Sequence, residues 1–142
     1  MKRIASCFLL VTLLLLAFSA CAEVRLDIEG YEWHLRTAMT VKGGELTVVA
    51  TDGTDAVHSE AKTVDITLKV DDGRLTIIDS TNGKTYEGTY RVEGRNPRGT
   101  DYKVTVDGKE GYATVAMTTY ADGGEEPTLP INLGEYSLYF YS

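Results

Sequence analysis

Apolar and polar residues alternate along most of this chain with a period of two, which is typical of β-strands that bury one face. The segment 64–70 is the clearest case, because Val, Ile, Leu and Val alternate there with Asp, Thr and Lys. No segment repeats its apolar residues with the spacing of a helix. The pattern predicts eight or nine strands, at 31–39, 46–51, 64–70, 75–78, 84–92, 102–106, 110–120 and 135–141, with 57–61 as the ninth.

The first strand predicts which of its side chains are buried. Trp33 shares one face of the segment 31–39 with apolar neighbours, so we expect it in the core at the base of the domain. The predicted inner face holds Tyr31, Trp33, Leu35 and Met39, and the outer face holds Glu32, His34 and Arg36.

Short turns between the strands predict an antiparallel meander. Asp71-Asp72-Gly73 and Asp107-Gly108 mark tight turns, and Asn82-Gly83 predicts a type I′ turn because both of its central residues need positive φ. The longest connection is an acidic loop at 121–130 that holds Pro127 and Pro130. We therefore expect an all-β domain at 31–142, either a small barrel or, alternatively, a β-sandwich, since both remove exposed strand edges.

The N-terminus predicts export. Lys2 and Arg3 precede an apolar run at 4–18, which is shorter than the roughly 20 residues of a transmembrane helix. Small residues follow, as in a signal peptide. We assign residues 1–20 to this leader and the acidic residues 21–30 to a tether.

Cys21 is the one cysteine that remains once the leader, which contains Cys7, is removed. The residues from Leu15 to Cys21 resemble the lipobox of bacterial lipoproteins, in which this cysteine is acylated and becomes the new N-terminus. The resemblance implies a protein anchored by lipid to a bacterial membrane of the cell envelope. The alternative is ordinary cleavage after Ala22, which discards Cys21 and leaves a secreted or periplasmic soluble protein.

Charge argues against two classes of partner. The chain has 14 Lys and Arg against 21 Asp and Glu, a net charge of −7. Loss of Lys2 and Arg3 leaves 12 against 21, a net charge of −9. Such a surface repels nucleic acid and anionic lipid headgroups. We expect no nucleic-acid partner and membrane contact through the N-terminal lipid only.

Two short motifs resemble those of the lipocalins. Gly30-Tyr31-Glu32-Trp33 is similar to the Gly-x-Trp of the first lipocalin strand, and Thr100-Asp101-Tyr102 is similar to the second lipocalin motif. The third motif, an Arg after the last strand, has no counterpart. The segment after the leader resembles short bacterial lipocalin-like lipoproteins. This implies an up-and-down barrel that holds one small hydrophobic or amphiphilic ligand.

The sequence contains no recognisable catalytic motif. It has no Gly-x-Ser-x-Gly, no His-Glu-x-x-His and no glycine-rich phosphate loop. His34 and His58 are expected on exposed polar positions, and two histidines without nearby cysteine do not complete a zinc site. We expect neither an enzyme nor a bound metal or cofactor.

Tyrosine is unusually frequent, with nine residues, and its apolar ring with a hydroxyl suits a binding surface. A ligand-holding interior would need small inward residues, for which Gly88, either Ala113 or Thr114, and Ala116 are candidates. A filled core of residues such as Leu35, Ile66, Ile77 and Val104 would instead favour the alternative function, a surface that binds another protein as an adhesin, inhibitor or assembly accessory. The candidate ligand-binding residues are Trp33, Tyr86, Tyr90, Tyr112 and Tyr120.

Overall fold

The computed structural model describes residues 26–51 and 61–142. The predicted leader, Cys21, His58 and most of the predicted strand 57–61 lie outside the described residues. No helix long and apolar enough to cross a membrane occurs in the described part of the chain. The described strands are β1 (Trp33–Lys42), β2 (Glu45–Ala50), β3 (Lys62–Thr63), β4 (Ile66–Asp71), β5 (Arg74–Asp79), β6 (Lys84–Asn96), β7 (Gly99–Val106), β8 (Lys109–Thr119), β9 (Glu125–Leu133) and β10 (Tyr136–Tyr141).

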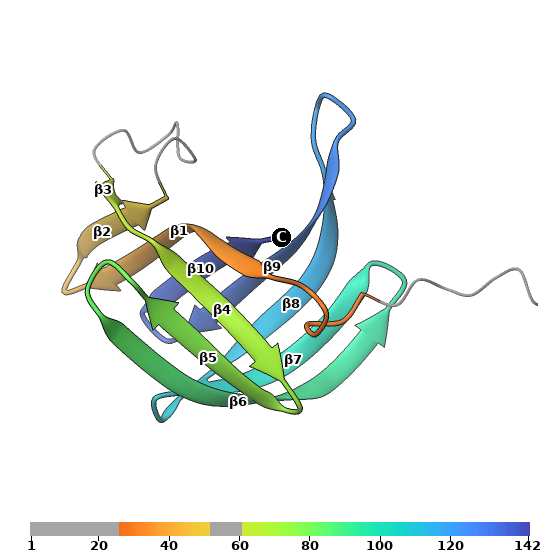
Figure 1. Ribbon diagram of the computed structural model, residues 1–142, viewed down its shortest axis with the longest axis horizontal. Helices are drawn as coiled ribbons and strands as arrows, with labels where there is room; N and C mark the ends of the chain where they lie inside the picture. The colour runs from red at the N-terminus through yellow and green to blue at the C-terminus, as the bar shows by residue number, and fades with distance from the viewer. Residues whose placement is uncertain (1–25, 52–60) are drawn as a thin grey trace, which may run out of the picture.

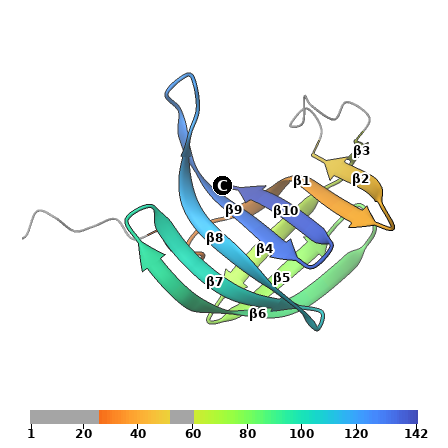
Figure 2. The same ribbon diagram turned by 180° about the vertical axis from the view of Figure 1, so that it is seen from behind.

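Eight strands close into an antiparallel barrel (Figure 1 and Figure 2). Their order is β1-β4-β5-β6-β7-β8-β9-β10, and β10 pairs with β1 to complete the ring. Closure gives both long edges of the sheet a partner. The all-β meander is confirmed as a barrel rather than a sandwich, an arrangement compatible with a lipocalin-like fold.

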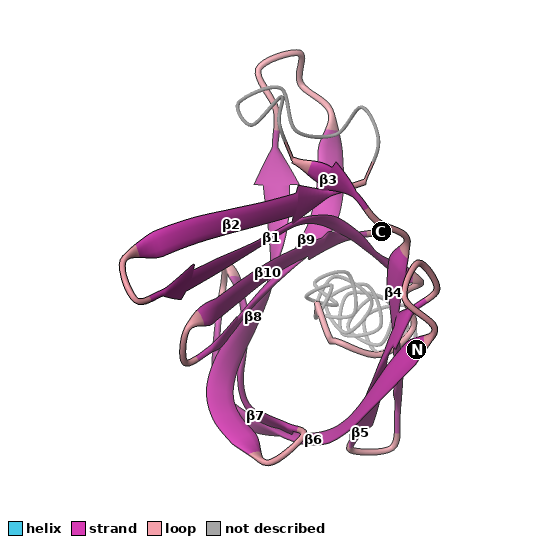
Figure 3. Cartoon of the chain, turned by 90° about the vertical axis from the view of Figure 1, so that its left-hand side faces the viewer, coloured by secondary structure: helices cyan, strands magenta, loops and turns pink. Residues whose placement is uncertain are grey.

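Two further strands, β2 and β3, lie beside the ring. β1 pairs with β4 through Trp33 and His34, whereas its residues 37–42 pair with β2. β2 holds β3 by a parallel pairing of two residues. Figure 3 looks into the ring and shows the β1–β2 hairpin extending away from it.

A β-bulge changes the orientation of β1 halfway along its length. Leu35 pairs with Phe140 and Thr37 pairs with Tyr139, so Arg36 is an extra residue without a counterpart in β10. Trp33 and Leu35 are buried as predicted, but the bulge shifts the alternation. Ala38 then points inward at 8% exposure and Met39 outward at 36%, so the predicted inner position of Met39 is wrong.

Two predicted turns are confirmed and one is wrong. Asp72 and Asp107 have φ of 44° and 49°, and each precedes a glycine with φ of 75°. Asn82-Gly83 does not form a two-residue turn, because Asp79 pairs with Lys84 across the four residues 80–83. The Asp79 carboxylate accepts hydrogen bonds from the main-chain N–H of Asn82 at 3.0 Å and from its amide at 2.7 Å. This stabilises a longer Asx-type loop.

The predicted long loop at 121–130 is also wrong, because β9 begins at Glu125. Both prolines lie within the strand. The pairing of β9 with β8 is interrupted between Thr128 and Ile131. Pro130 lies in this interval, and proline has no N–H to donate to the neighbouring strand. The strand persists because its alternate residues Leu129, Ile131 and Leu133 fill the core.

The barrel interior is filled with apolar side chains. Trp33 is 1% exposed, which confirms its predicted burial. Gly88 leaves no space, because a Cβ there would lie 2.8 Å from Leu75 Cδ1. The buried hydrophobic cluster comprises Ile28, Trp33, Leu35, Ala38, Val64, Leu68, Leu75, Ile77, Tyr102, Val104, Val106, Ala113, Val115, Leu129, Ile131, Leu133 and Phe140.

Candidate functional site

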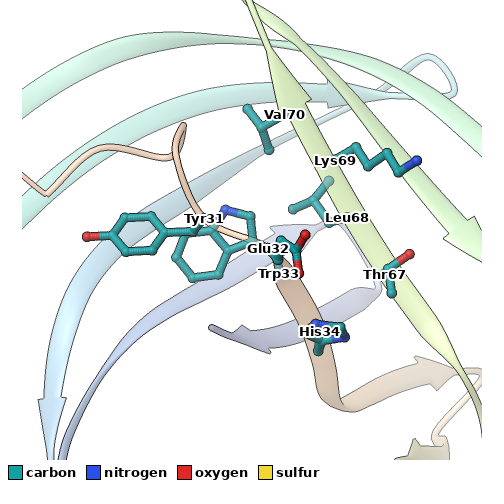
Figure 4. Close-up of a pocket in the computed structure, with 8 residues that line it drawn as sticks. All are labelled: Tyr31, Glu32, Trp33, His34, Thr67, Leu68, Lys69 and Val70. Carbon is teal, nitrogen blue, oxygen red and sulfur yellow. The ribbon is translucent and has the colours of Figure 1, made fainter.

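The barrel wall has its shortest seam between β1 and β4. The two strands share two residue pairs, Trp33 with Leu68 and His34 with Thr67. Beyond Trp33, β4 continues to Asp71, whereas the chain at 26–32 bends away from it. A groove of about 410 Å³ lies at this divergence (Figure 4).

The apolar side of the groove is formed by residues that also belong to the core. Trp33 and Leu68 are almost completely buried and form its floor. Tyr31 and Val70 are half-buried and flank them. The rings of Tyr31 and Trp33 are in contact, with centroids 5.1 Å apart and planes tilted by 51°, so they form a tilted aromatic pair.

The polar side of the groove carries both signs of charge. Glu32, His34 and Lys69 are exposed, and Thr67 adds a hydroxyl. In Figure 4 the side chains of Lys69 and Thr67 point away from the aromatic pair. The charged groups therefore lie at the rim of the groove and the apolar groups form its floor, a division found in many small-molecule sites.

The segment 26–31 crosses the adjacent end of the barrel, where it is the orange loop beside β7 in Figure 1. Ile28 is fully buried, and its carbonyl oxygen accepts a hydrogen bond from Trp33 Nε1 at 2.8 Å. Thr100 Oγ1 donates to the carbonyl oxygen of Leu26 at 2.7 Å. Residues 26–28 of the predicted tether are therefore packed against the barrel.

The five candidate ligand-binding residues do not converge on one site. Trp33 lies under the groove, and Tyr86 packs against the core. Tyr90 packs there too, and its hydroxyl donates a hydrogen bond to the Glu29 carboxylate at the barrel end. Tyr112 is 63% exposed on β8.

Tyr120 belongs to a separate cluster around the bulge. Arg36 forms an ion pair with Glu126 at 2.5 Å and donates a hydrogen bond to the Tyr120 hydroxyl at 3.0 Å. Its guanidinium also lies 4.6 Å from the ring centroid of Tyr141, within cation–π range. These contacts join β1 to the projecting β8–β9 hairpin, and Tyr120 takes part in that connection.

Two of these tyrosines hold their protons more tightly than usual. Burial and the hydrogen bond to Glu29 raise the pKa of Tyr90 to about 12. The hydrogen bond to Glu126 raises the pKa of Tyr120. Both hydroxyls therefore remain neutral donors at physiological pH.

Sequence reasoning missed most of the groove. Alternation predicts an inward Tyr31 and an outward Glu32, and it predicts that the apolar and polar residues of 64–70 lie on opposite faces. That alternation is correct, but it does not reveal that β1 and β4 diverge between these residues. No cluster of three or more His, Cys, Asp or Glu within the described ranges is arranged to hold a metal ion.

The chain matches no protein family model, no curated protein and no solved structure.

Proposed function

We propose that this domain is a non-enzymatic binding protein that takes one small amphiphilic molecule in the groove between β1 and β4. The supporting observation is the juxtaposition of an apolar aromatic floor with a charged rim in a groove of about 410 Å³. Pockets that bind small molecules commonly have 300–1,000 Å³ and a few polar groups. The filled interior favours this lateral site over the central cavity expected from the resemblance to lipocalins.

In this proposal the apolar part of the ligand lies against Tyr31 and Val70, above the ring of Trp33. Its polar end meets Lys69, His34 or Glu32 at the rim. The protein acts from the cell envelope of a bacterium, exported by its leader and anchored through lipid on Cys21. No cofactor or nucleic acid takes part.

The test uses Trp33, the single tryptophan of the chain, as a reporter. A panel of fatty alcohols, isoprenoids and phenols is screened by thermal shift, since a ligand stabilises the folded state by an amount that grows with the logarithm of its concentration relative to Kd. Hits are titrated against Trp33 fluorescence. We expect Tyr31→Ala and Lys69→Glu to weaken binding about tenfold, which corresponds to roughly 1.4 kcal/mol.

Tyr112→Ala is the matched control, because it removes an exposed aromatic ring on β8 far along the ring of strands. It should leave the affinity unchanged. If no compound of the panel changes the melting temperature or the Trp33 emission, the proposed groove function is overturned. Equal losses in Tyr31→Ala and Tyr112→Ala would do the same.

A second candidate function, binding of another protein, is favoured by the β1–β2 hairpin. Met39, Val41 and Leu46 are 36%, 55% and 52% exposed. Val41 pairs with Leu46, and Met39 pairs with Val48, so these residues share one face. Exposed apolar residues gathered on one surface mark interaction sites.

This candidate is tested with immobilised extended peptides of alternating apolar sequence, since strand edges bind such segments. Leu46→Lys should abolish binding and Met117→Lys, at another exposed apolar position on β8, should not. Retention of binding in Leu46→Lys would exclude the hairpin as the interface.

A further inference from the structure

The outer wall of the barrel has a hollow over the neighbouring strands β6, β7 and β8. Tyr102, Val104 and Val106 of β7 are buried in the core, so the residues between them point outward. The hollow has a volume of about 320 Å³ and shares no residue with the groove between β1 and β4. It is lined by Thr89, Tyr90, Arg91, Lys103, Thr105 and Glu110.

Two cations lie opposite each other in this hollow. Arg91 of β6 pairs with Lys103 of β7, and Thr89 pairs with Thr105 in the same ladder. Side chains that are directly opposite have Cβ atoms about 4.5–5.5 Å apart, and like charges at such positions repel each other. The chain has a net charge of −7, so this pair does not result from a generally basic surface. An anion between the two side chains would remove the repulsion.

Each cation already has one glutamate partner, but neither glutamate lies between them. Arg91 forms an ion pair at 2.7 Å with Glu93 of its own strand, and Lys103 forms one at 3.1 Å with Glu110 of β8. The side chains of Arg91 and Glu110 are 70% and 69% exposed, so both ion pairs contribute little to stability. A ligand can therefore displace either glutamate at a low cost in free energy.

An aromatic ring adjoins the hollow. On the side away from Arg91, Lys103 pairs with Tyr112 of β8, which is 63% exposed. The tyrosine ring offers an apolar surface beside the polar lining. The hydroxyls of Thr89 and Thr105 can both donate and accept hydrogen bonds. Such a combination suits a ligand that has a ring, several hydroxyl groups and a negative charge.

We propose that this hollow binds a sugar acid. The carboxylate of the sugar lies between Arg91 and Lys103, where it accepts charge-assisted hydrogen bonds. Its hydroxyl groups meet Thr89 and Thr105, and one face of its ring lies against Tyr112. This site is separate from the groove between β1 and β4, and its function does not depend on a ligand there.

The size and lining of the hollow favour this class of ligand over two simpler ones. Its volume lies within the range of about 300–1,000 Å³ that small-molecule sites have. An inorganic anion would use the two cations but leave Tyr112 without a role. A hydrocarbon chain would leave the charged and hydroxyl groups of the lining without partners, which is unfavourable.

The experiment titrates the protein with glucuronate and with glucose, and follows the main-chain amide chemical shifts by NMR. We expect saturable shifts at Thr89, Lys103 and Thr105, and an affinity for glucuronate at least about tenfold higher than for glucose. Acetate and inorganic phosphate serve as probes that carry the charge without the sugar ring, and both should bind more weakly than glucuronate.

Three variants separate the contributions of charge and ring. Arg91→Gln and Lys103→Gln should each weaken glucuronate binding about tenfold and leave glucose binding unchanged. Lys84→Gln is the matched control, because it removes a charge from another exposed position of β6, and it should behave as wild type. Tyr112→Ala should weaken the binding of glucuronate and glucose alike, since its ring contacts carry no charge.

Four results would overturn the proposal: no saturable shifts at these amides, equal affinity for glucose and glucuronate, equal losses in Lys84→Gln and Arg91→Gln, or phosphate binding as tight as that of glucuronate. Tyr31→Ala alters the groove between β1 and β4 and should leave glucuronate binding unchanged. Failure of the groove proposal and failure of this one are therefore distinguishable.

Discussion

At the scale of single residues, Trp33 is a buried side chain with two specific contacts at one end of the barrel. Its ring packs on Tyr31, and its indole N–H donates to the carbonyl oxygen of Ile28. Pairing with Leu68 also makes it half of the β1–β4 seam. Its side chain is therefore shared by the core, the groove and the segment that closes the barrel end.

Replacement of Trp33 by alanine should lower the free energy of unfolding by about 3–5 kcal/mol, since it leaves a cavity and an unpaired carbonyl oxygen. Urea denaturation followed by circular dichroism measures this. Tyr112→Ala, at an exposed position, should change it by less than about 0.5 kcal/mol. A Trp33→Ala midpoint equal to that of Tyr112→Ala would contradict the structural role of Trp33.

Tyr90 predicts a loss of stability in alkali. Its pKa is raised from 10.0 to about 12 in the folded protein, so the folded state keeps the proton longer than the unfolded state does. This contribution is complete below pH 10 and is lost as the pH rises from 10 to 12. Denaturant midpoints at pH 9 and 11 should differ less in Tyr90→Phe than in wild type. An identical difference in both proteins would count against this assignment.

At the scale of elements, two glycines allow the strands of the barrel to approach closely. A Cβ at Gly111 would lie 1.9 Å from the carbonyl oxygen of Asn132, and one at Gly99 would lie 2.1 Å from that of Val115. The neighbouring atoms are backbone and cannot rotate away. These positions set the curvature of β7, β8 and β9, since bulky side chains there would force the strands apart.

Gly111→Ala should therefore destabilise the domain by about 1–3 kcal/mol through overpacking. Gly94→Ala is the control, because its Cβ would meet no atom closer than 3.9 Å. Thermal unfolding of both variants decides the matter. A Gly111→Ala protein as stable as Gly94→Ala would show that β8 and β9 separate without cost.

The β1 bulge acts at the same scale. Because Arg36 is the extra residue, its side chain reaches Glu126 and Tyr120 across the neighbouring strands. The ion pair is partly exposed, with side-chain exposures of 27% and 22%, so its own contribution is modest. Its effect is geometric, since it fixes the β8–β9 hairpin against β1.

At the scale of the whole molecule, the proposed lipid anchor determines where the protein works. Replacement of Cys21 by alanine should move the protein from the membrane fraction to the soluble fraction, since two or more acyl chains are needed for stable attachment. Immunoblotting of fractionated bacteria measures this. Ser19→Ala, which keeps Cys21, is the control. A Cys21→Ala protein that stays in the membrane fraction would exclude lipidation at this residue.

Local sequence determined the strands and most of the fold class. Period-two alternation depends on neighbours within one strand, so the ranges near β4, β7 and β8 could be predicted directly. The turns at Asp72 and Asp107 followed for the same reason, since a following glycine suits the positive φ of a tight turn. Closure into a ring was one of two alternatives that the pattern left open.

Tertiary structure alone decided the bulge in β1, the course of β9 and the packing of Ile28, because all three depend on residues far apart in the chain. The bulge at Arg36 appears only when β1 is aligned with β10, and it reverses the orientation predicted for Met39. β9 remains a strand although it contains two prolines, because its alternate residues complete a core that other strands form. The hydrogen bond between Ile28 and Tyr102 spans 74 residues, so the predicted tether gave no sign that it enters the barrel. Alternation assigns a side chain to a face, whereas only the packed ring shows which faces meet.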